Sequence, residues 1–172
     1  DIIFHLAAIV SGQAEQEFDL GWNINAKGSW GLFEAIRQQG ENYCPRLIFT
    51  SSIAVFGAPF PEKIPDDFFT TPLTSYGAQK AISELLLADY SRKNMVDGVS
   101  IRLPTICVRP GKPNLAASGF FSGIIREPLN GQEAILPVNT DVRHWHATPR
   151  AAAGFLIHAA EIDSSKLSDR IT

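Results

Sequence analysis

The chain has 172 residues, of which 45% are hydrophobic, with 15 basic and 18 acidic residues and a formal net charge of −3. This composition excludes general disorder and predicts one soluble globular domain with a sizeable core. The basic residues do not cluster, so we expect neither a nucleic-acid partner nor an anionic-membrane partner.

Cysteine use and hydropathy indicate the cellular compartment. Cys44 and Cys107 have no partner at metal-binding spacing, which is typical of reduced, structural thiols. No apolar run approaches the roughly 20 residues of a membrane helix, and no basic-then-apolar leader opens the sequence. We therefore expect a cytoplasmic protein without a membrane partner.

The first predicted element is the apolar run 2–6, which is typical of a buried parallel strand and directly follows Asp1. The last residues, 169–172, begin another β-branched segment without a closing turn. Since a domain seldom starts inside its own core, we expect the chain to be an internal fragment.

Strand and helix patterns alternate along the sequence. Predicted strands cover residues 2–6, 46–51, 98–103 and 134–137. Predicted helices cover residues 14–39, 75–93, 119–129 and 149–161. Gly40 is placed to end the first helix, and the proline-rich stretches 52–74 and 109–113 are predicted loops. This alternation, with long crossovers, predicts an α/β fold whose parallel sheet is covered on both faces.

The most informative spacing is that of Tyr76 and Lys80, at the start of the second predicted helix. Side chains four residues apart share a helix face, so the phenol and the ammonium project together. Because an adjacent cation favours the phenolate, we expect Lys80 to lower the pKa of Tyr76 and let it move a proton near neutral pH. Ser52 follows a buried strand, where it is placed to hydrogen-bond the oxygen on which Tyr76 acts. Each feature alone is common, whereas together they assemble a proton donor, its activator and an orienting hydroxyl.

At these residues the sequence resembles the extended short-chain dehydrogenase/reductase superfamily, which includes the NAD-dependent epimerases and dehydratases. The Ser and Tyr-x-x-x-Lys triad of that superfamily falls on Ser52, Tyr76 and Lys80. Further matching segments are His5-Leu6-Ala7-Ala8, Asn25 with Gly28, residues 51–57 and Arg102-Leu103-Pro104. The resemblance implies a partial Rossmann-type, doubly wound parallel sheet with a small substrate-binding portion.

The resemblance also implies the organisation of the site. Residues 1–110 are then the second half of an NAD-binding domain, and residues 111–172 are part of a substrate-binding region with a returning Rossmann helix. The implied catalytic residues are Ser52, Tyr76, Lys80 and Asn25, the last by positioning the lysine. The implied cofactor contacts are Leu6, Ala7, Ala8, Asn25, Tyr76, Lys80 and Pro104. The glycine-rich loop that binds the pyrophosphate in that superfamily does not occur in the sequence; NAD is the expected cofactor, and NADP stays open.

The later segments 102–114, 118–129 and 141–146 are similar to superfamily members that oxidise small sugar acids such as D-erythronate. Thr105 stands where nucleotide-sugar enzymes usually carry an asparagine, and Arg143 occupies the anion-binding arginine position. A guanidinium binds a carboxylate bidentately, which suits a sugar acid. The expected substrate contacts are therefore Ser52, Thr105 and Arg143.

The implied function is NAD-dependent oxidation of a secondary alcohol of a small sugar acid. A nucleotide-sugar 4-epimerase or dehydratase that uses the same triad stays open. A third alternative also stays open: the 172 residues by themselves are not an enzyme, because the phosphate-binding loop is missing.

Two remaining features have more ordinary interpretations. His144 and His146 share one face of an extended segment but have no visible third ligand, so we expect hydrogen bonding or a substrate contact and no metal. The aromatic stripe of helix 14–39 is wider than one sheet contact requires, and members of the superfamily commonly pair through the corresponding helices. We therefore expect a homodimer formed by helices 14–39 and 75–93.

Overall fold

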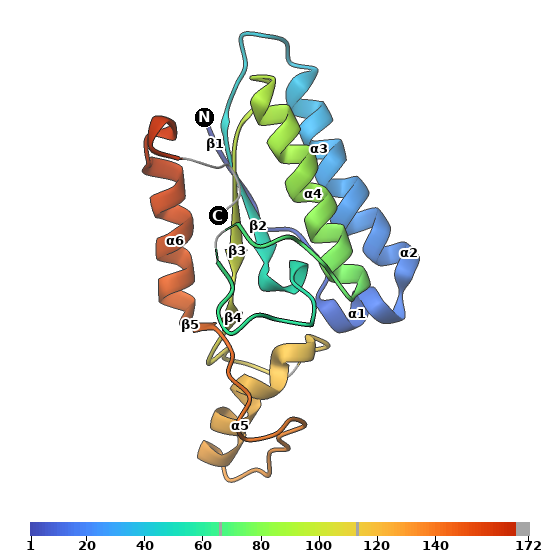
Figure 1. The fold of residues 1–172 in the computed structure, drawn as a ribbon, viewed down its shortest axis with the longest axis vertical. Coiled ribbons are helices and arrows are strands. Elements are labelled where there is room, and N and C mark those ends of the chain that lie inside the picture. The colour runs from blue at the N-terminus through green and yellow to red at the C-terminus, as the bar shows by residue number, and fades with distance from the viewer. Residues whose placement is uncertain (66, 113, 168–172) are drawn as a thin grey trace.

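The computed structural model describes residues 1–65, 67–112 and 114–167 and confirms the predicted α/β class (Figure 1). The strands are β1 (Ile2–His5), β2 (Arg46–Ser52), β3 (Asp97–Leu103), β4 (Thr105–Ile106) and β5 (His146–Ala147). The α-helices are α1 (Ser11–Gln16), α2 (Phe18–Gly21), α3 (Gly28–Arg37), α4 (Ser75–Arg92), α5 (Phe120–Leu129) and α6 (Pro149–Glu161). A π-helix, η1 (Trp22–Lys27), and the short 3-10 helices η2 (Ile53–Val55), η3 (Ala117–Gly119) and η4 (Ser164–Lys166) complete these elements. None of the helices within the described ranges is long and apolar enough to cross a membrane.

The central sheet is parallel, in the order β1-β2-β3. Leu47 of β2 lies beside Ile3 of β1 on one side and Gly98 of β3 on the other. Helices α1 to α4, with η1, cover one face of the sheet, and α6 covers the other (Figure 1). The prediction of a parallel sheet covered on both faces is therefore confirmed.

The middle of β2 packs against the helices on both faces of the sheet. Leu47, Ile48 and Phe49 are all completely buried, as expected for a strand covered on both faces. Because alternate side chains point to opposite faces, Leu47 and Phe49 pack with Phe33 of α3 and Leu87 of α4. Ile48 packs on the opposite face, together with Val99 and Ala159. The two clusters fix both helical layers to one strand.

The helix predicted over residues 14–39 is wrong in detail. The structure has a succession of shorter helices that starts at Ser11 and ends at Arg37, and one of them is the π-helix η1. The helix ends at Arg37, shortly before the predicted stop at Gly40, and Gly40 has a φ of +96°, a conformation that glycine adopts without strain.

Side-chain hydrogen bonds accompany the π-helical segment. The amide of Gly28 donates to the carbonyl of Asn23, five residues earlier, as in a π-helix. The carbonyl of Asn25 accepts from the hydroxyl of Ser29 at 2.6 Å and from that of Ser83 in α4 at 3.4 Å. An apolar periodicity of 3.6 residues carries no signal for such an insertion, which explains the wrong prediction.

The strand predicted over residues 134–137 is also wrong. This segment has no regular structure, and Ile135 is 78% exposed. An apolar run becomes a strand only when a neighbouring strand pairs with it, and the partner of β4 is β5, with Thr105 beside His146.

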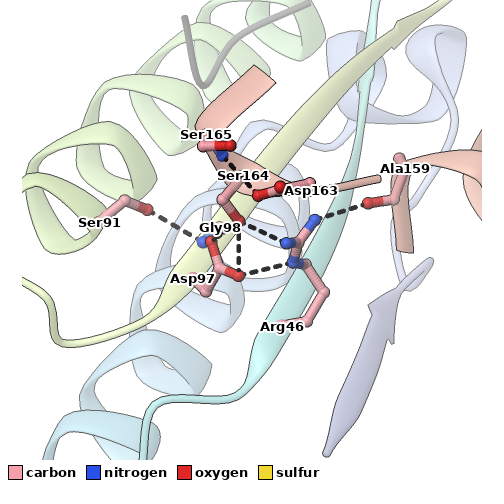
Figure 2. A network of polar contacts seen from close by, with 8 residues as sticks. All are labelled: Arg46, Ser91, Asp97, Gly98, Ala159, Asp163, Ser164 and Ser165. Carbon is pink, nitrogen blue, oxygen red and sulfur yellow. Dashed lines mark hydrogen bonds and ion pairs between the residues drawn. The ribbon is translucent and has the colours of Figure 1, made fainter. Parts of the chain in front are cut away.

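A polar network fastens α6 and the segment after it to the amino ends of the central strands (Figure 2). Arg46, the first residue of β2, donates to the Asp97 carboxylate at 2.7 Å and to the Ala159 carbonyl at 2.9 Å. Ser164 donates to both oxygens of that carboxylate at 3.0 Å. This end of the sheet is thereby closed, whereas the carboxyl ends of the strands open toward the site.

Candidate active site

A cavity of about 1030 Å³ lies at the carboxyl ends of the central strands. This is where open parallel sheets bind their ligands. The predicted site residues that line it are Leu6, Ala8, Ser52, Tyr76, Lys80, Pro104, Thr105 and Arg143. Ala7 and Asn25, which were also predicted, do not line it. The cavity therefore brings the expected proton-transfer residues and the expected anion-binding arginine to one place.

The Ser52 and Tyr76 side chains line the same cavity, and the Ser52 hydroxyl acts to lower the pKa of the Tyr76 phenol. Ser52 is the last residue of β2, and its Oγ also accepts from the Ala54 amide at 3.1 Å, which caps η2. Tyr76 lies in the first turn of α4, close to this strand end. A Cβ on the next residue, Gly77, would lie 2.2 Å from the Ala54 carbonyl oxygen, so only glycine permits the approach.

Lys80 lies one turn further along α4 and is only 2% exposed. Its Nζ donates to the carbonyl of Thr50 at 2.7 Å. The same nitrogen lies 4.7 Å from the centre of the Phe49 ring and 5.7 Å from that of Tyr76. Burial lowers the pKa of Lys80 to about 8, and the charge of Glu84 opposes this shift.

The prediction that the pKa of Tyr76 is lowered is wrong. Burial raises the pKa of the Tyr76 phenol, and the Ser52 hydroxyl only partly offsets this effect. The sequence predicted a lowered pKa because it placed the two side chains on one helix face. In the structure the ammonium donates to a backbone carbonyl, and desolvation of the phenol is the larger influence.

Asn25 is buried next to the cavity and connects its walls. Its Oδ1 accepts from the Ile9 amide at 2.9 Å, and its Nδ2 donates to the Ile9 carbonyl at 3.3 Å. The same Nδ2 donates to Oε1 of Gln79 at 2.8 Å. Gln79 directly precedes Lys80, so Asn25 bonds to the helical turn that carries the lysine. Sequence reasoning missed Gln79, although a polar residue on the inner face of an amphipathic helix was a usable signal.

His5 is a buried strand histidine with a hydrogen-bond partner. Its Nε2 lies 2.9 Å from the hydroxyl of Ser29, and its ring stacks on Phe49. Burial, followed by the charge of Lys80, lowers its pKa. The uncharged imidazole is therefore favoured next to the Lys80 ammonium.

The other wall of the cavity comes from β4 and the segment before β5. Thr105 Oγ1 lies 2.8 Å from His144 Nε2, and both residues line the cavity. Arg143 is exposed and lines it as well. Arg109, which was interpreted only as part of a loop, is a further cationic residue in the lining. The described residues contain no group of three or more potential metal ligands.

These arrangements match a known family. The model of the NAD dependent epimerase/dehydratase family covers residues 1–168. The chain belongs to this family. The resemblance inferred from the triad motifs is confirmed.

Named relatives give the comparison more detail. The D-erythronate dehydrogenase of Cupriavidus necator is 53% identical over 168 residues, which are 98% of this chain and 51% of that protein. The D-erythronate dehydrogenase of Haemophilus influenzae is 50% identical over 97% of this chain and 52% of its own length. The crystal structure of a nucleoside-diphosphate-sugar epimerase from Agrobacterium tumefaciens is 67% identical, with a TM-score of 0.92, over 99% of this chain and 50% of that one. The chain thus spans about half the length of the curated relatives it matches.

The buried ammonium of Lys80 predicts a pH-dependent stability. Its folded-state pKa of about 8 lies below the 10.5 of an ordinary lysine, so the unfolded chain binds more protons between these values. The free energy of unfolding of the wild type, relative to Lys80→Met, should rise by about 2–3 kcal/mol as the pH increases through this window.

Urea unfolding at pH values below, within and at the top of the window measures this difference. Lys93→Met, which removes an exposed lysine just after the same helix, is the matched control and should show no such rise. A difference between wild type and Lys80→Met that stays constant with pH would contradict the burial of a charged Lys80.

Proposed function

We propose that the complete protein is an NAD-dependent dehydrogenase that oxidises a secondary alcohol of a small sugar acid such as D-erythronate. The observation that carries the proposal is the convergence of Ser52, Tyr76 and Lys80 with Arg143 on one cavity. Three of these residues suit proton transfer, and the fourth suits a carboxylate. The names of the two curated relatives that are at least half identical support the same assignment.

The residues around the cavity fit a nicotinamide cofactor. An ammonium has three protons, and Lys80 donates one of them to Thr50, so it has donors to offer to the hydroxyls of a ribose. Leu6, Ala8 and Pro104 supply compact apolar walls on the same cavity. When bound, NAD accepts the hydride from the alcohol carbon.

Residues of this chain would transfer the proton of the substrate hydroxyl. As the phenolate, Tyr76 takes the proton of the substrate hydroxyl during oxidation, and Ser52, which lines the same cavity, orients the same oxygen. Lys80 lies close enough to stabilise the phenolate as its charge develops. Because burial raises the pKa of Tyr76, the phenolate that oxidation needs is favoured by alkaline pH, whereas the neutral phenol suits the reverse reaction, in which it donates to a carbonyl oxygen.

A nucleotide-sugar epimerase or dehydratase is the second candidate, because the A. tumefaciens structure that is 67% identical carries that name. Such an enzyme uses the same triad but returns the hydride to the sugar, so net NADH formation separates the two candidates. A third alternative, that the 172 residues alone do not bind a dinucleotide, is tested by measuring their affinity for NAD.

Substitution of the phenol tests the proton transfer. Tyr76→Phe in the complete protein should lower kcat about 100- to 10,000-fold, the usual contribution of a general acid or base, while the affinity for NAD is retained. Steady-state kinetics with D-erythronate and a fluorescence titration with NAD measure the two quantities. Tyr90→Phe, a phenol of the same helix outside the cavity, is the control. A Tyr76→Phe enzyme that retained most of its turnover would exclude Tyr76 as the proton acceptor.

Arg143 tests the nature of the anion. If it binds a carboxylate, Arg143→Ala should raise the KM for D-erythronate about 10- to 100-fold, the effect of losing a hydrogen bond to a charged group. Arg150→Ala, an exposed arginine outside the cavity, should leave the KM unchanged. Calorimetric titration in the presence of NAD tests the alternative. Appreciable affinity for uridine diphosphate, with none for D-erythronate, would favour the epimerase.

A homodimer through the helical layer is part of the proposal. Of the predicted aromatic stripe, Phe33 is buried in the core, whereas Phe18 is exposed and Trp30 is 49% exposed. On α4, Leu85 is 64% exposed. Helices α3 and α4 pack side by side over the sheet (Figure 1), so these apolar groups lie on the layer that would meet a second copy.

Charge placed on this layer should separate the subunits. Trp30→Glu combined with Leu85→Glu should convert a dimer into a monomer, because each interface would bury two copies of both carboxylates. Light scattering at micromolar concentration measures the mass. Phe69→Glu, at an exposed apolar residue of the proline-rich loop, should leave the mass unchanged. A wild-type protein that is already monomeric would remove the dimer from the proposal.

A further inference from the structure

Thr105 and His144 form a hydrogen-bonded pair in the cavity wall that proton transfer does not use. The Thr105 Oγ1 to His144 Nε2 distance is 2.8 Å. Backbone pairing already joins the two segments, since the Thr105 amide donates to the Trp145 carbonyl at 3.1 Å and β4 pairs with β5. The side-chain bond is therefore not needed to hold the segments together.

Aromatic neighbours hold the His144 ring in one orientation. The ring of Phe121, from α5, stacks on it with centroids 4.7 Å apart and an angle of 15°. His146 meets it at 5.3 Å in an edge arrangement. The Cys107 thiol donates to the Phe121 carbonyl at 3.2 Å, which ties α5 to the segment after β4. A ring fixed in this way also fixes the direction of the Thr105 hydroxyl.

The electrostatic surroundings favour a neutral pair. Although His144 is an exposed residue, partial burial of its ring, followed by the charge of His146, lowers its pKa and so favours the uncharged imidazole. Arg143, the preceding residue, is exposed and lines the same cavity. A charged guanidinium next to a neutral alcohol and imidazole matches a ligand that carries both a carboxylate and hydroxyl groups.

We propose that His144 is a specificity-determining positioning residue that orients the Thr105 hydroxyl to bind one hydroxyl of the sugar acid. The identity of this ligand rests on the proposed function. A threonine hydroxyl has one proton and two lone pairs, and its bond to His144 leaves bonding capacity for the ligand. A site built to hydrogen-bond a substrate hydroxyl rejects analogues that lack it, because its own polar groups are then left unpaired.

Two substitutions remove the bond from either side. His144→Phe keeps a ring to stack on Phe121 but has no nitrogen, and Thr105→Val keeps the branched shape but has no hydroxyl. Thr105→Ser restores the hydroxyl and is the rescue variant. His146→Phe is the matched control, because phenylalanine keeps a ring next to His144 and Phe121, and His146 does not line the cavity.

Kinetics in the complete protein, with NAD and D-erythronate, measure the effect. We expect His144→Phe and Thr105→Val each to raise KM about 3- to 10-fold, as for the loss of one neutral hydrogen bond, with little change in kcat. The double variant should be no worse than either single one, since both remove the same bond. Thr105→Ser and His146→Phe should remain near the wild type.

Deoxy analogues of D-erythronate identify the hydroxyl that is bound. For the analogue that lacks the hydroxyl bound by Thr105, the KM should be the same in the wild type, His144→Phe and Thr105→Val. The hydrogen bond between Thr105 and the substrate is already absent with this analogue. Multiplicative losses in the double variant, unchanged KM values, or an equal loss for every analogue would overturn the role of His144.

Failure of the proposed function gives a different result. A wild-type enzyme that does not oxidise D-erythronate refutes the dehydrogenase, and the same variants are then titrated calorimetrically with uridine diphosphate glucose in the presence of NAD. A loss of affinity shared by His144→Phe, Thr105→Val and their double variant keeps the positioning role for a sugar hydroxyl. Equal affinity in the wild type and the variants overturns it.

Discussion

The side-chain amide of Asn25 is the constraint on which the site depends. It bonds the amide and carbonyl of Ile9, in the segment after β1, and the side chain of Gln79 in α4. Asn25 is 1% exposed, so its loss would leave buried polar groups unpaired, at a cost of about 1–3 kcal/mol for each. Since Lys80 follows Gln79, this amide also fixes the register of the helix that carries Tyr76 and Lys80.

The π-helix gives Asn25 its orientation. Within η1 the Asn25 carbonyl accepts from the hydroxyls of Ser29 and Ser83, while the Asn25 side chain bonds to Ile9 and Gln79. His5 joins the same set of contacts through Ser29. A local departure from α-helical geometry thus connects the end of β1 with α4, and such departures are frequent at functional sites.

Sequence patterns predicted the strands and helices that have a regular apolar periodicity and missed the elements that have none. The buried apolar run 47–49 was sufficient to predict a strand. The pattern of 75–93 predicted a helix, although the buried face of α4 is largely polar and includes Gln79, Lys80 and Glu84. The π-helix and the β4–β5 pair were missed, since each depends on contacts between residues far apart in the chain. For the site, the motifs located Tyr76 and Lys80, but the direction of the Tyr76 shift depends on burial, which spacing does not report.

The charges around the cavity explain how one site can combine proton transfer with the binding of an anion. Lys63, Lys80, Arg109 and Arg143 line it, and among the described residues Glu62 is the one carboxylate in the lining, so the field within it favours a negatively charged ligand. The ammonium of Lys80 is buried and bonded to a carbonyl, whereas Arg143 is exposed. A carboxylate gains most by meeting the exposed guanidinium, because a second fully buried charge would lose more hydration than it recovers. In the proposed function, this difference in burial places the substrate carboxylate at the cavity wall that carries Thr105 and His144, and Lys80 acts on the phenol and the cofactor.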